Sequence, residues 1–346
     1  MKIAILGGGP IGLTYAALLR QNGHQVVIYS QSANADATPL TIEGAVEFSG
    51  QFDYAADLEG ATAGADILLC TRRAVGVQNL IDNLAPLVQV NQTLIFSADL
   101  SLSAHYAAMV LGTLGKQNAI ISWSTTVATA QRRGPTHIVS GTLRDRIDYA
   151  VANPTGPDGS GMLLEALFGA RFHRLTSVLA VALSNLNPPI HLANALANLT
   201  RIEKGEDWDN YAGITPAVGR MIEALDKERI TLAGQFGLKV RDVFEHYLQT
   251  FPNLAPGSVS EMAARVSAKG PGTPGPKLIN TRYLTEDIPF GLVPLVRLGE
   301  LAGVAMPLHD AGIKFASAYT GQDFASQNTM LPELLAHCSL EKLTAL

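Results

Sequence analysis

Residues 1–12 read MKIAILGGGPIG, and this stretch decides the fold of the first half of the chain. The apolar run at residues 3–6 is typical of a strand that is buried on both faces of a parallel sheet. After it, Gly7 permits a tight turn, Gly9 lets the backbone approach a pyrophosphate, and Gly12 lets a helix sit close to the strand. The loop predicts a dinucleotide site at a helix N-terminus, with cofactor contacts from Gly7, Gly9, Pro10, Ile11 and Gly12. The competing interpretation is a glycine turn in some other α/β fold.

Strand and helix patterns alternate along the rest of this half. Strands are expected at residues 25–29, 66–70 and 93–97, with a helix between the last two at residues 77–87. This order predicts a doubly wound α/β sheet of the Rossmann type. Loops at residues 71–74 and 97–101 would then lie at the carboxyl edge, where ligands bind, so Thr71 is a predicted cofactor contact. Strand-like segments that would extend the sheet follow at residues 120–126, 137–140 and 146–152.

The loop after the second strand bears on the choice of cofactor. An NAD site usually has an acid there for the ribose hydroxyls, whereas this chain has Ser30, Gln31 and Ser32. No arginine or lysine stands nearby in the sequence to hold a 2′-phosphate. Asp36 is close enough to reach a ribose, although a solvated loop residue explains it as well. The sequence therefore predicts a cofactor contact at Ser30, a mild preference for NADP(H), and NAD(H) as the open alternative.

Composition limits the classes of function. The 346 residues are enough for about two domains, and 47% of them are apolar while 16% are charged, as in a well-packed protein. A net charge of −5 offers no basic field for nucleic acid or an anionic membrane surface. Cys70 and Cys338 are the only cysteines, so neither a disulfide framework nor a cysteine-built metal site is expected, and we predict a reducing, cytoplasmic setting without a metal.

No targeting or membrane segment is expected. The four apolar residues before the glycines are too few for a signal peptide. The uncharged run at residues 175–200 contains Asn185, Asn187 and His191, which favours a buried helix over a membrane span. Small molecules are the expected partners, and a homodimer is allowed by the sequence without being indicated by it.

From residue 176 onward the pattern is nearly all helical, so we place a Rossmann domain at residues 1–175 and a second, all-helical domain at residues 176–346. Asn187 followed by two prolines predicts a helix start, with His191 in its first turns. The helix dipole disfavours a cation there, so a neutral imidazole would be available as a base, although a core histidine explains the residue as well. Further helices are expected at residues 215–236, 240–249, 258–266 and 292–304.

Residues 280–295, NTRYLTEDIPFGLVPL, gather charge in a chain that has little of it. Arg282, Glu286 and Asp287 could form an ordinary surface ion pair. Alternatively, a carboxylate beside a histidine fixes the tautomer of that histidine, and an arginine beside both can grip a substrate carboxylate. Spacing alone does not show that residues 191 and 287 meet. Arg132 and Arg133 likewise suit either a solvated turn or the binding of an acidic substrate.

The chain resembles the opine dehydrogenase family, which includes octopine dehydrogenase, octopine synthase and N-(1-D-carboxyethyl)-norvaline dehydrogenase. The resemblance is carried by GGGPIG at 7–12, STTVATAQRR at 124–133, SNLNPPIH at 184–191, ITPAVGRMIEALDKERI at 214–230 and INTRYLTEDIPFGLVPL at 279–295. It implies a reductive condensation, in which an amino acid and a 2-oxo acid form an imine that NAD(P)H reduces. It also implies a second domain like the C-terminal domain of 6-phosphogluconate dehydrogenase.

The resemblance further implies roles for single residues. His191 would be the acid/base for the amine and the carbinolamine, and Asp287 would orient it. Arg282 would hold a substrate carboxylate, and Thr125 and Arg132 would contact substrate. Family members often carry an acid just before the Ser/Thr pair, where this chain has Trp123, which suggests an apolar or otherwise different amino acid.

Two other functions remain open at this stage. A ketopantoate-reductase-like 2-oxo or 2-hydroxy acid oxidoreductase shares the glycine start and would need no amine. Its usual proton donor is a lysine, and Lys204 and Lys227 stand in no recognisable motif. The alternative from another class is an NADPH-binding redox sensor without turnover, which has no need of a proton relay. The amino acid, the oxo acid and the product stereochemistry are not determined by the sequence.

Overall fold

The structure is a computed structural model, and it describes residues 1–31, 38–153, 159–270 and 272–346. Ser32 and Asp36, weighed above for the choice of cofactor, lie outside the described residues. The chain divides into two compact units, of which the first contains Met1–Ala182 and Ala336–Leu346 and the second contains Leu183–Leu335. The last residues pack with the first unit, where the backbone oxygen of Leu343 lies 3.1 Å from Nε2 of the buried His105.

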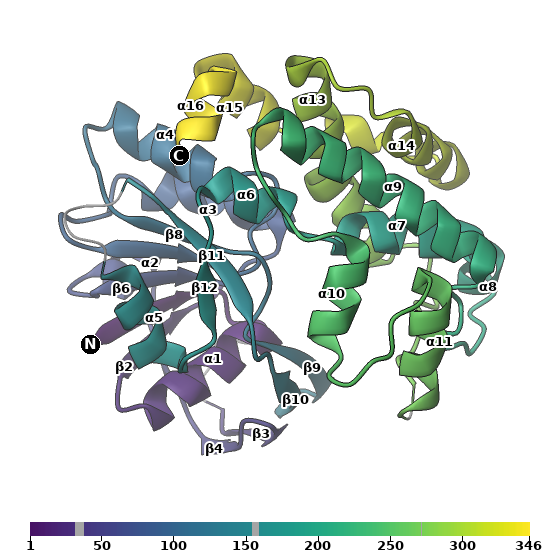
Figure 1. Ribbon diagram of the computed structural model, residues 1–346. Helices are drawn as coiled ribbons and strands as arrows, with labels where there is room; N and C mark the ends of the chain where they lie inside the picture. The colour runs from purple at the N-terminus through teal and green to yellow at the C-terminus, as the bar shows by residue number, and fades with distance from the viewer. Residues whose placement is uncertain (32–37, 154–158, 271) are drawn as a thin grey trace. The chain divides into compact units, whose positions relative to one another are not determined.

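An eight-stranded sheet forms the centre of the first unit (Figure 1). Its strands lie in the order β12 (Phe172–Arg174), β11 (Ile147–Ala152), β8 (Ile120–Trp123), β7 (Thr93–Phe96), β6 (Ile67–Cys70), β1 (Lys2–Leu6), β2 (Gln25–Tyr29) and β5 (Asp53–Tyr54). Neighbouring strands are parallel except β8 and β11. The predicted α/β fold is confirmed, because the short apolar runs of the sequence are its central, fully buried strands.

Helices connect these strands and lie against the sheet. They are α1 (Pro10–Gln21), α2 (Leu58–Thr62), the 3-10 turn η1 (Ala74–Gly76), α3 (Val77–Leu84), α4 (Ser103–Thr113), α5 (Ser160–Phe168), α6 (Val178–Leu183) and, near the end of the chain, α16 (Leu340–Ala345). The helix α1 packs against α5, and α3 packs against α4. Helix α1 follows β1 directly, so the strand, the glycine loop and the helix form one continuous unit.

A second, four-stranded sheet was not foreseen. Its strands lie in the order β4 (Phe48–Gly50), β3 (Leu40–Gly44), β10 (His137–Leu143) and β9 (Ala128–Gly134). The prediction that residues 137–140 extend the main sheet is therefore wrong, whereas β8 and β11 do extend it. Strand β10 pairs in parallel with β3, which lies almost a hundred residues earlier, and no local pattern could reveal this pairing. Arg132 and Arg133 belong to β9 and not to a turn.

Trp123 lies in the core of the first unit. Its side chain is fully buried, and its ring packs edge-on against Phe168 with centroids 5.4 Å apart. Tyr15 and Phe172 complete this aromatic cluster. The indole therefore belongs to the core of the first unit, and the amino acid that it was taken to suggest stays a prediction.

The second unit is helical, apart from an isolated bridge between Asp209 and Pro274. Its helices are α7 (Asn187–Ala197), α8 (Leu199–Glu203), α9 (Pro216–Gln235), α10 (Val243–Thr250), α11 (Val259–Ala268), α12 (Arg282–Thr285), the π-helix η2 (Ile288–Leu292), α13 (Val293–Ala302), α14 (Pro307–Thr320), the 3-10 turn η3 (Phe324–Ser326) and α15 (Met330–His337). The capping box predicted from Ser258 and Glu261 is present at the start of α11.

Helix α9 organises this unit. It is 20 residues long and packs against α7, α11 and α13 (Figure 1). Its buried face carries an ion pair, Arg229 with Asp226, in which the guanidinium is completely excluded from solvent. Glu228 on the same helix contacts His309 at the start of α14, where Oε2 of the carboxylate lies 2.8 Å from Nδ1 of the imidazole. The segment 214–230, which helped to carry the family resemblance, is therefore largely structural.

Candidate active site

The glycine loop has the geometry of a phosphate cradle. Gly7 has φ of +142°, and a Cβ placed on Gly12 would lie 2.0 Å from the backbone oxygen of Gly7, so neither position tolerates a side chain. A Cβ on Gly9 would meet nothing within 4 Å, which leaves open space in front of the loop. Gly9 is also the N-cap of α1, and Pro10 begins the helix. No side chain caps the free N–H groups of the first turn, so they are available to a ligand. The loop therefore fits the pyrophosphate of a dinucleotide.

Two further predicted contacts lie against this loop. The hydroxyl of Thr71 donates to the backbone oxygen of Gly7 at 3.0 Å, and it lies where a Cβ on Gly7 or Gly12 would be. Ser30 packs against Gly8, because a Cβ on Gly8 would come within 2.8 Å of the serine side chain. The tertiary structure thus brings Thr71, Ser30 and the glycines together from three different strands.

A basic residue lies at the same edge, contrary to the expectation from sequence. Arg72 donates from Nη1 to Oε1 of Gln31 at 2.8 Å, which brings its guanidinium to the loop after β2. The sequence could not show this, because residues 31 and 72 meet only after β6 and β2 have both paired with β1. Gly76 makes room for the arginine, since a Cβ there would lie 2.7 Å from Nη2.

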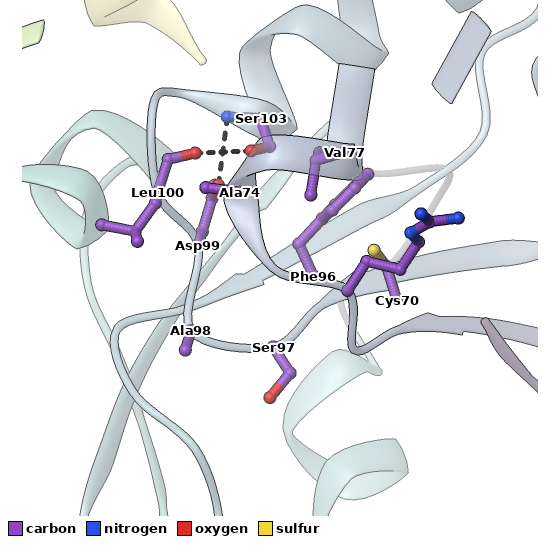
Figure 2. Close-up of a pocket in the computed structure, with 10 residues that line it drawn as sticks. Cys70, Ala74, Val77, Phe96, Ser97, Ala98, Asp99, Leu100 and Ser103 are labelled. Atoms are coloured by element: carbon purple, nitrogen blue, oxygen red, sulfur yellow. Dashed lines mark hydrogen bonds between the residues drawn. The ribbon is translucent and has the colours of Figure 1, made fainter. Parts of the chain in front are cut away.

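A pocket opens between the predicted ligand-binding loops after β6 and β7 (Figure 2). It is lined by Cys70, Arg72, Ala74, Val77, Phe96, Ser97, Ala98, Asp99, Leu100 and Ser103. Burial raises the pKa of the Cys70 thiol to about 12, so this cysteine is not a nucleophile at neutral pH. The pocket lies where ligands bind in doubly wound folds, at the carboxyl ends of parallel strands.

Asp99 shapes this pocket, and sequence reasoning missed it. The carboxylate accepts hydrogen bonds from the hydroxyl of Ser122 at 2.8 Å and from the backbone N–H groups of Ser103 and Ala104. Figure 2 shows the bond from Ser103. Burial raises the pKa of Asp99, and these hydrogen bonds oppose that shift. The loop around it has left-handed φ angles at the non-glycine residues Ala98, Ser101 and Leu102, a strained course that the Asp99 contacts hold in place. An acid in the loop that follows a predicted strand was the available signal.

In the helical unit, the predicted pair of His191 and Asp287 is in direct contact. Nδ1 of His191 lies 2.7 Å from Oδ2 of Asp287 across 96 residues of sequence. Asp287 is a carboxylate and only accepts, so Nδ1 carries the proton of this hydrogen bond and Nε2 is left for other partners. The Asp287 side chain is 2% exposed and that of His191 is 13% exposed, so the imidazole remains accessible while its partner is enclosed.

The elements of this site follow from local sequence. Helix α7 begins at Asn187, whose N–H donates to the side chain of Asn185, and its first turn holds the two prolines. His191 therefore lies one turn inside the helix. Asp287 stands between α12 and the π-helix η2, a bulged geometry that is frequent at functional sites.

Tyr283 is the residue of this site for which sequence reasoning found no role. Its ring lies flat on the imidazole of His191, with centroids 3.7 Å apart and planes 5° apart. Burial raises the pKa of the Tyr283 phenol to about 12, so the hydroxyl is neutral. Arg282, its neighbour, is exposed and forms no ion pair with the residues that the structure describes. Glu286 is buried beside them.

The two remaining predicted substrate contacts belong to the first unit. Thr125 lies half-buried in the bend after β8. Arg132 is exposed on β9 and donates to the backbone oxygen of Pro135, within its own hairpin. Among the described residues, no group of three or more histidine, cysteine, aspartate or glutamate side chains could hold a metal. No described helix is long and apolar enough to cross a membrane.

Family models match both halves of the chain. Residues 174–320 match the alpha-helical domain of NAD/NADP octopine/nopaline dehydrogenase. Residues 3–151 match ketopantoate reductase PanE/ApbA. The helical match contains His191, Arg282 and Asp287.

Relatives extend the similarity over the whole length. Opine dehydrogenase of Arthrobacter sp. (strain 1C) is 28% identical over 96% of this chain and 94% of its own. Protein ocs of Agrobacterium tumefaciens (strain Ach5) is 25% identical over 96% of this chain and 95% of its own. Among solved structures, octopine dehydrogenase with NADH and L-arginine has a TM-score of 0.83 at 20% identity, covering 100% of this chain and 98% of that one. A ketopantoate reductase from Ralstonia eutropha JMP134 has a TM-score of 0.67 at 17% identity, covering 93% and 99%. The helical-domain match and the full-length relatives agree: the chain is similar to opine dehydrogenases over nearly its whole length, and residues 174–320 are similar to the alpha-helical domain of NAD/NADP octopine/nopaline dehydrogenase.

Proposed function

We propose that this chain joins the amino group of an amino acid to a 2-oxo acid and reduces the resulting imine to a secondary amine dicarboxylate. The observation that carries the proposal is the contact between His191 and Asp287, an accessible imidazole with an enclosed carboxylate on its other nitrogen. This arrangement is the one that a general acid/base needs, because the carboxylate fixes the tautomer and leaves Nε2 for the substrate.

The imidazole has two proton transfers to perform. An amino acid arrives as an ammonium ion, and Nε2 of His191 takes one of its protons so that the free amine can attack the carbonyl carbon of the oxo acid. The protonated imidazole then gives this proton to the carbinolamine hydroxyl, which leaves as water. Asp287 stabilises the imidazolium between the two transfers. A bound nicotinamide cofactor supplies the hydride that completes the reduction.

Arg282 is the proposed anchor for a substrate carboxylate. Both substrates of this reaction carry one, and a guanidinium binds a carboxylate through two parallel hydrogen bonds. Arg282 begins α12, is exposed, and lies one residue before Tyr283 on the ring of His191. Its guanidinium is not engaged in an ion pair within the described residues and so remains available. Thr125 and Arg132 stay as proposed substrate contacts from the first unit.

The requirement for an amine separates this reaction from its main rival. With pyruvate as the oxo acid, we expect oxidation of NADPH only after an amino acid is added. L-Arginine and pyruvate are a reasonable first pair, since octopine dehydrogenase has been solved with each of them. The assay follows absorbance of the reduced cofactor across a panel of amino acids with pyruvate, 2-oxoglutarate and glyoxylate.

The contrary outcomes of this assay are informative. Equal oxidation without any amine would favour a ketopantoate-reductase-like reaction, which the match at residues 3–151 keeps as the second candidate. Lys204 and Lys227 are both exposed, so neither resembles an enclosed proton donor. Cofactor binding without turnover on any pair would favour the redox sensor.

For the cofactor, we propose a preference for NADPH over NADH. Ser30 and Gln31 offer no acid to repel a 2′-phosphate, and the guanidinium of Arg72 reaches Gln31 from the neighbouring loop. Both bound forms occur in similar folds, since octopine dehydrogenase was solved with NADH and yersinopine dehydrogenase with NADP+. We assign the preference for NADPH to the positive charge of Arg72, which would attract the 2′-phosphate.

Arg72→Gln tests this preference. We expect the KM for NADPH to rise about 10-fold, the value of one charge-assisted hydrogen bond, while the KM for NADH hardly changes. Arg73→Gln is the matched control, because Arg73 is the exposed neighbour on the same loop. An equal effect on both cofactors, or none on either, would contradict the assignment of Arg72.

The setting that we propose is a reducing cytoplasm. Both cysteines are free in the structure, and Cys70 is buried as a thiol. Association into a homodimer is also a proposal, and the mass of the protein in solution, by light scattering, tests it.

A further inference from the structure

One short segment supplies both contacts to the imidazole of His191. Asp287 meets the edge of the ring at Nδ1, and Tyr283 covers one face of it with planes only 5° apart. The two residues are four positions apart, which is about one helical turn, so the segment presents them on the same side. The imidazole is therefore held at an edge and on a face by the same piece of backbone.

These two contacts restrict different motions. A hydrogen bond to Nδ1 fixes the position of one ring atom, but it lets the ring tilt about that point. A flat contact with a second ring fixes the plane. With both in place, the direction in which Nε2 points is set, and a general acid/base depends on this direction because proton transfer requires a short, aligned hydrogen bond.

The stack is imposed by the surrounding structure. Aromatic rings prefer offset or edge-to-face arrangements, as Trp123 and Phe168 adopt elsewhere in this protein. A nearly parallel pair with centroids 3.7 Å apart is closer to the less favoured face-to-face arrangement. Its presence indicates that the backbone around Tyr283, and not the intrinsic affinity of the rings, decides the geometry.

The far end of Tyr283 leads back to the helix that carries His191. The phenol oxygen lies 3.5 Å from Oδ1 of Asn210, which also accepts from Nδ2 of the fully buried Asn194 at 3.0 Å. Asn198 donates to Oδ1 of Asn194 at 2.9 Å and so fixes the orientation of that amide. Asn194 and Asn198 follow His191 on one face of the segment that begins with α7. The three amide side chains therefore connect the hydroxyl of Tyr283 to the helix that carries His191.

We propose that Tyr283 is a positioning residue that holds the plane of the His191 ring, so that Nε2 points at the reacting amine while Nδ1 stays on Asp287. The catalytic consequence rests on the proposed function, but the ring geometry does not. The contribution comes from the aromatic face, and the hydroxyl serves only to anchor the ring. Phenylalanine should therefore replace Tyr283 with little loss, whereas an aliphatic side chain of similar bulk should not.

The test compares Tyr283→Leu and Tyr283→Met with Tyr283→Phe. For the two aliphatic variants we expect kcat to fall about 10- to 100-fold, with the Kd for NADPH unchanged, and for Tyr283→Phe we expect kcat near the wild-type value. Tyr319→Leu is the matched control, because Tyr319 is an exposed tyrosine on α14. Circular dichroism identifies any variant that fails to fold. If one of the two aliphatic variants does not fold, the other can still be compared with Tyr283→Phe.

Nuclear magnetic resonance measures the stack without any substrate. A ring that lies flat on tyrosine has its carbon-bound protons shifted upfield by the ring current. We expect upfield His191 signals, assigned by their absence in His191→Ala, in the wild type and in Tyr283→Phe, and their displacement downfield in the aliphatic variants. If the wild type turns over no pair of substrates, the proposed function fails while this measurement still decides the stack.

Two results would overturn the inference. Wild-type kcat together with wild-type His191 signals in both aliphatic variants would show that the ring face is not needed. A loss of kcat in Tyr283→Phe as large as in Tyr283→Leu, with His191 signals unmoved, would assign the role to the hydroxyl instead.

Discussion

His191→Ala is expected to lower kcat by about 10²- to 10⁴-fold, the range that a general acid/base contributes. The reason is that the His191 imidazole is accessible and contacts an enclosed carboxylate, whereas the His309 imidazole, which also contacts a carboxylate, is completely buried. Binding of NADPH should not change, because the glycine loop that fits the pyrophosphate belongs to the first unit. Steady-state kinetics and cofactor titration by fluorescence measure the two quantities separately.

Asp287→Asn should have an effect of the same order, about 10²-fold or more, for a different reason. An amide has almost the shape of the carboxylate, but it can donate a hydrogen bond to Nδ1. The imidazole proton would then be on Nε2, which could no longer take a proton from the ammonium substrate. Normal turnover in both variants would contradict the assigned roles. His173→Ala, at an exposed histidine on β12, is the control for a histidine substitution as such.

The helical unit holds another imidazole and carboxylate pair, His309 with Glu228, and its contrast with His191 and Asp287 explains the choice. His309 is completely buried against Glu228, which also accepts from the backbone N–H groups of Leu308 and His309 at the start of α14. The pKa of Glu228 is lowered: burial opposes this shift, and the hydrogen bonds from His309 and the backbone outweigh it. An imidazole without solvent access cannot reach a substrate, so this pair fastens α14 to α9.

Arg229→Ala is expected to lower the free energy of unfolding by about 3–5 kcal/mol, the cost of removing one partner of a buried ion pair. The guanidinium donates to Asp226 and to the backbone oxygens of Leu183 and Arg241, and it is fully buried. Asp226 in turn accepts from the N–H of Val243 at the start of α10 at 2.7 Å. Without the arginine, the buried carboxylate of Asp226 loses its charged partner and keeps only the N–H of Val243, and two carbonyl groups each lose a donor.

Chemical denaturation measures this loss through the midpoint of the transition of the helical unit. Arg220→Ala is the matched control, because Arg220 lies on the exposed face of the same helix, and it should leave the midpoint within error. An unchanged midpoint in Arg229→Ala would show that the helices α9 and α10 are held by apolar packing alone. Reduced kcat with an unchanged midpoint would place Arg229 in the catalytic machinery, contrary to the structure.

Much of the fold could be predicted because its signals are local. The glycine loop, the buried strand before it and the helix after it lie within 21 residues, and each depends on its immediate neighbours. The capping box at Ser258 and Glu261 is another such signal. The second sheet escaped prediction because β3 and β10 pair across distant segments, and hydrogen bonds between strands leave no trace in the sequence of either.

The candidate site shows the same division. Residue types at positions 191, 282 and 287 indicated acid/base chemistry and a grip on a carboxylate, and the tertiary structure showed that the first and last are in contact. Trp123 was interpreted from its position beside a motif, and only the tertiary structure shows that its ring is buried against Phe168. Arg72 was overlooked because the loop it belongs to meets Gln31 only through the sheet.

The sequence by itself determined the dinucleotide loop, the helical second half and the chemical groups available for catalysis, because glycine conformations, helical periodicity and side-chain chemistry are properties of short segments. Only the tertiary structure decided which of those groups meet. It brought Asp287 to the edge and Tyr283 to the face of His191, and it enclosed a similar pair, His309 with Glu228, where no substrate can reach. The physical reason is that contacts between distant residues depend on how helices pack and on what they exclude from solvent, and neither can be seen along the chain.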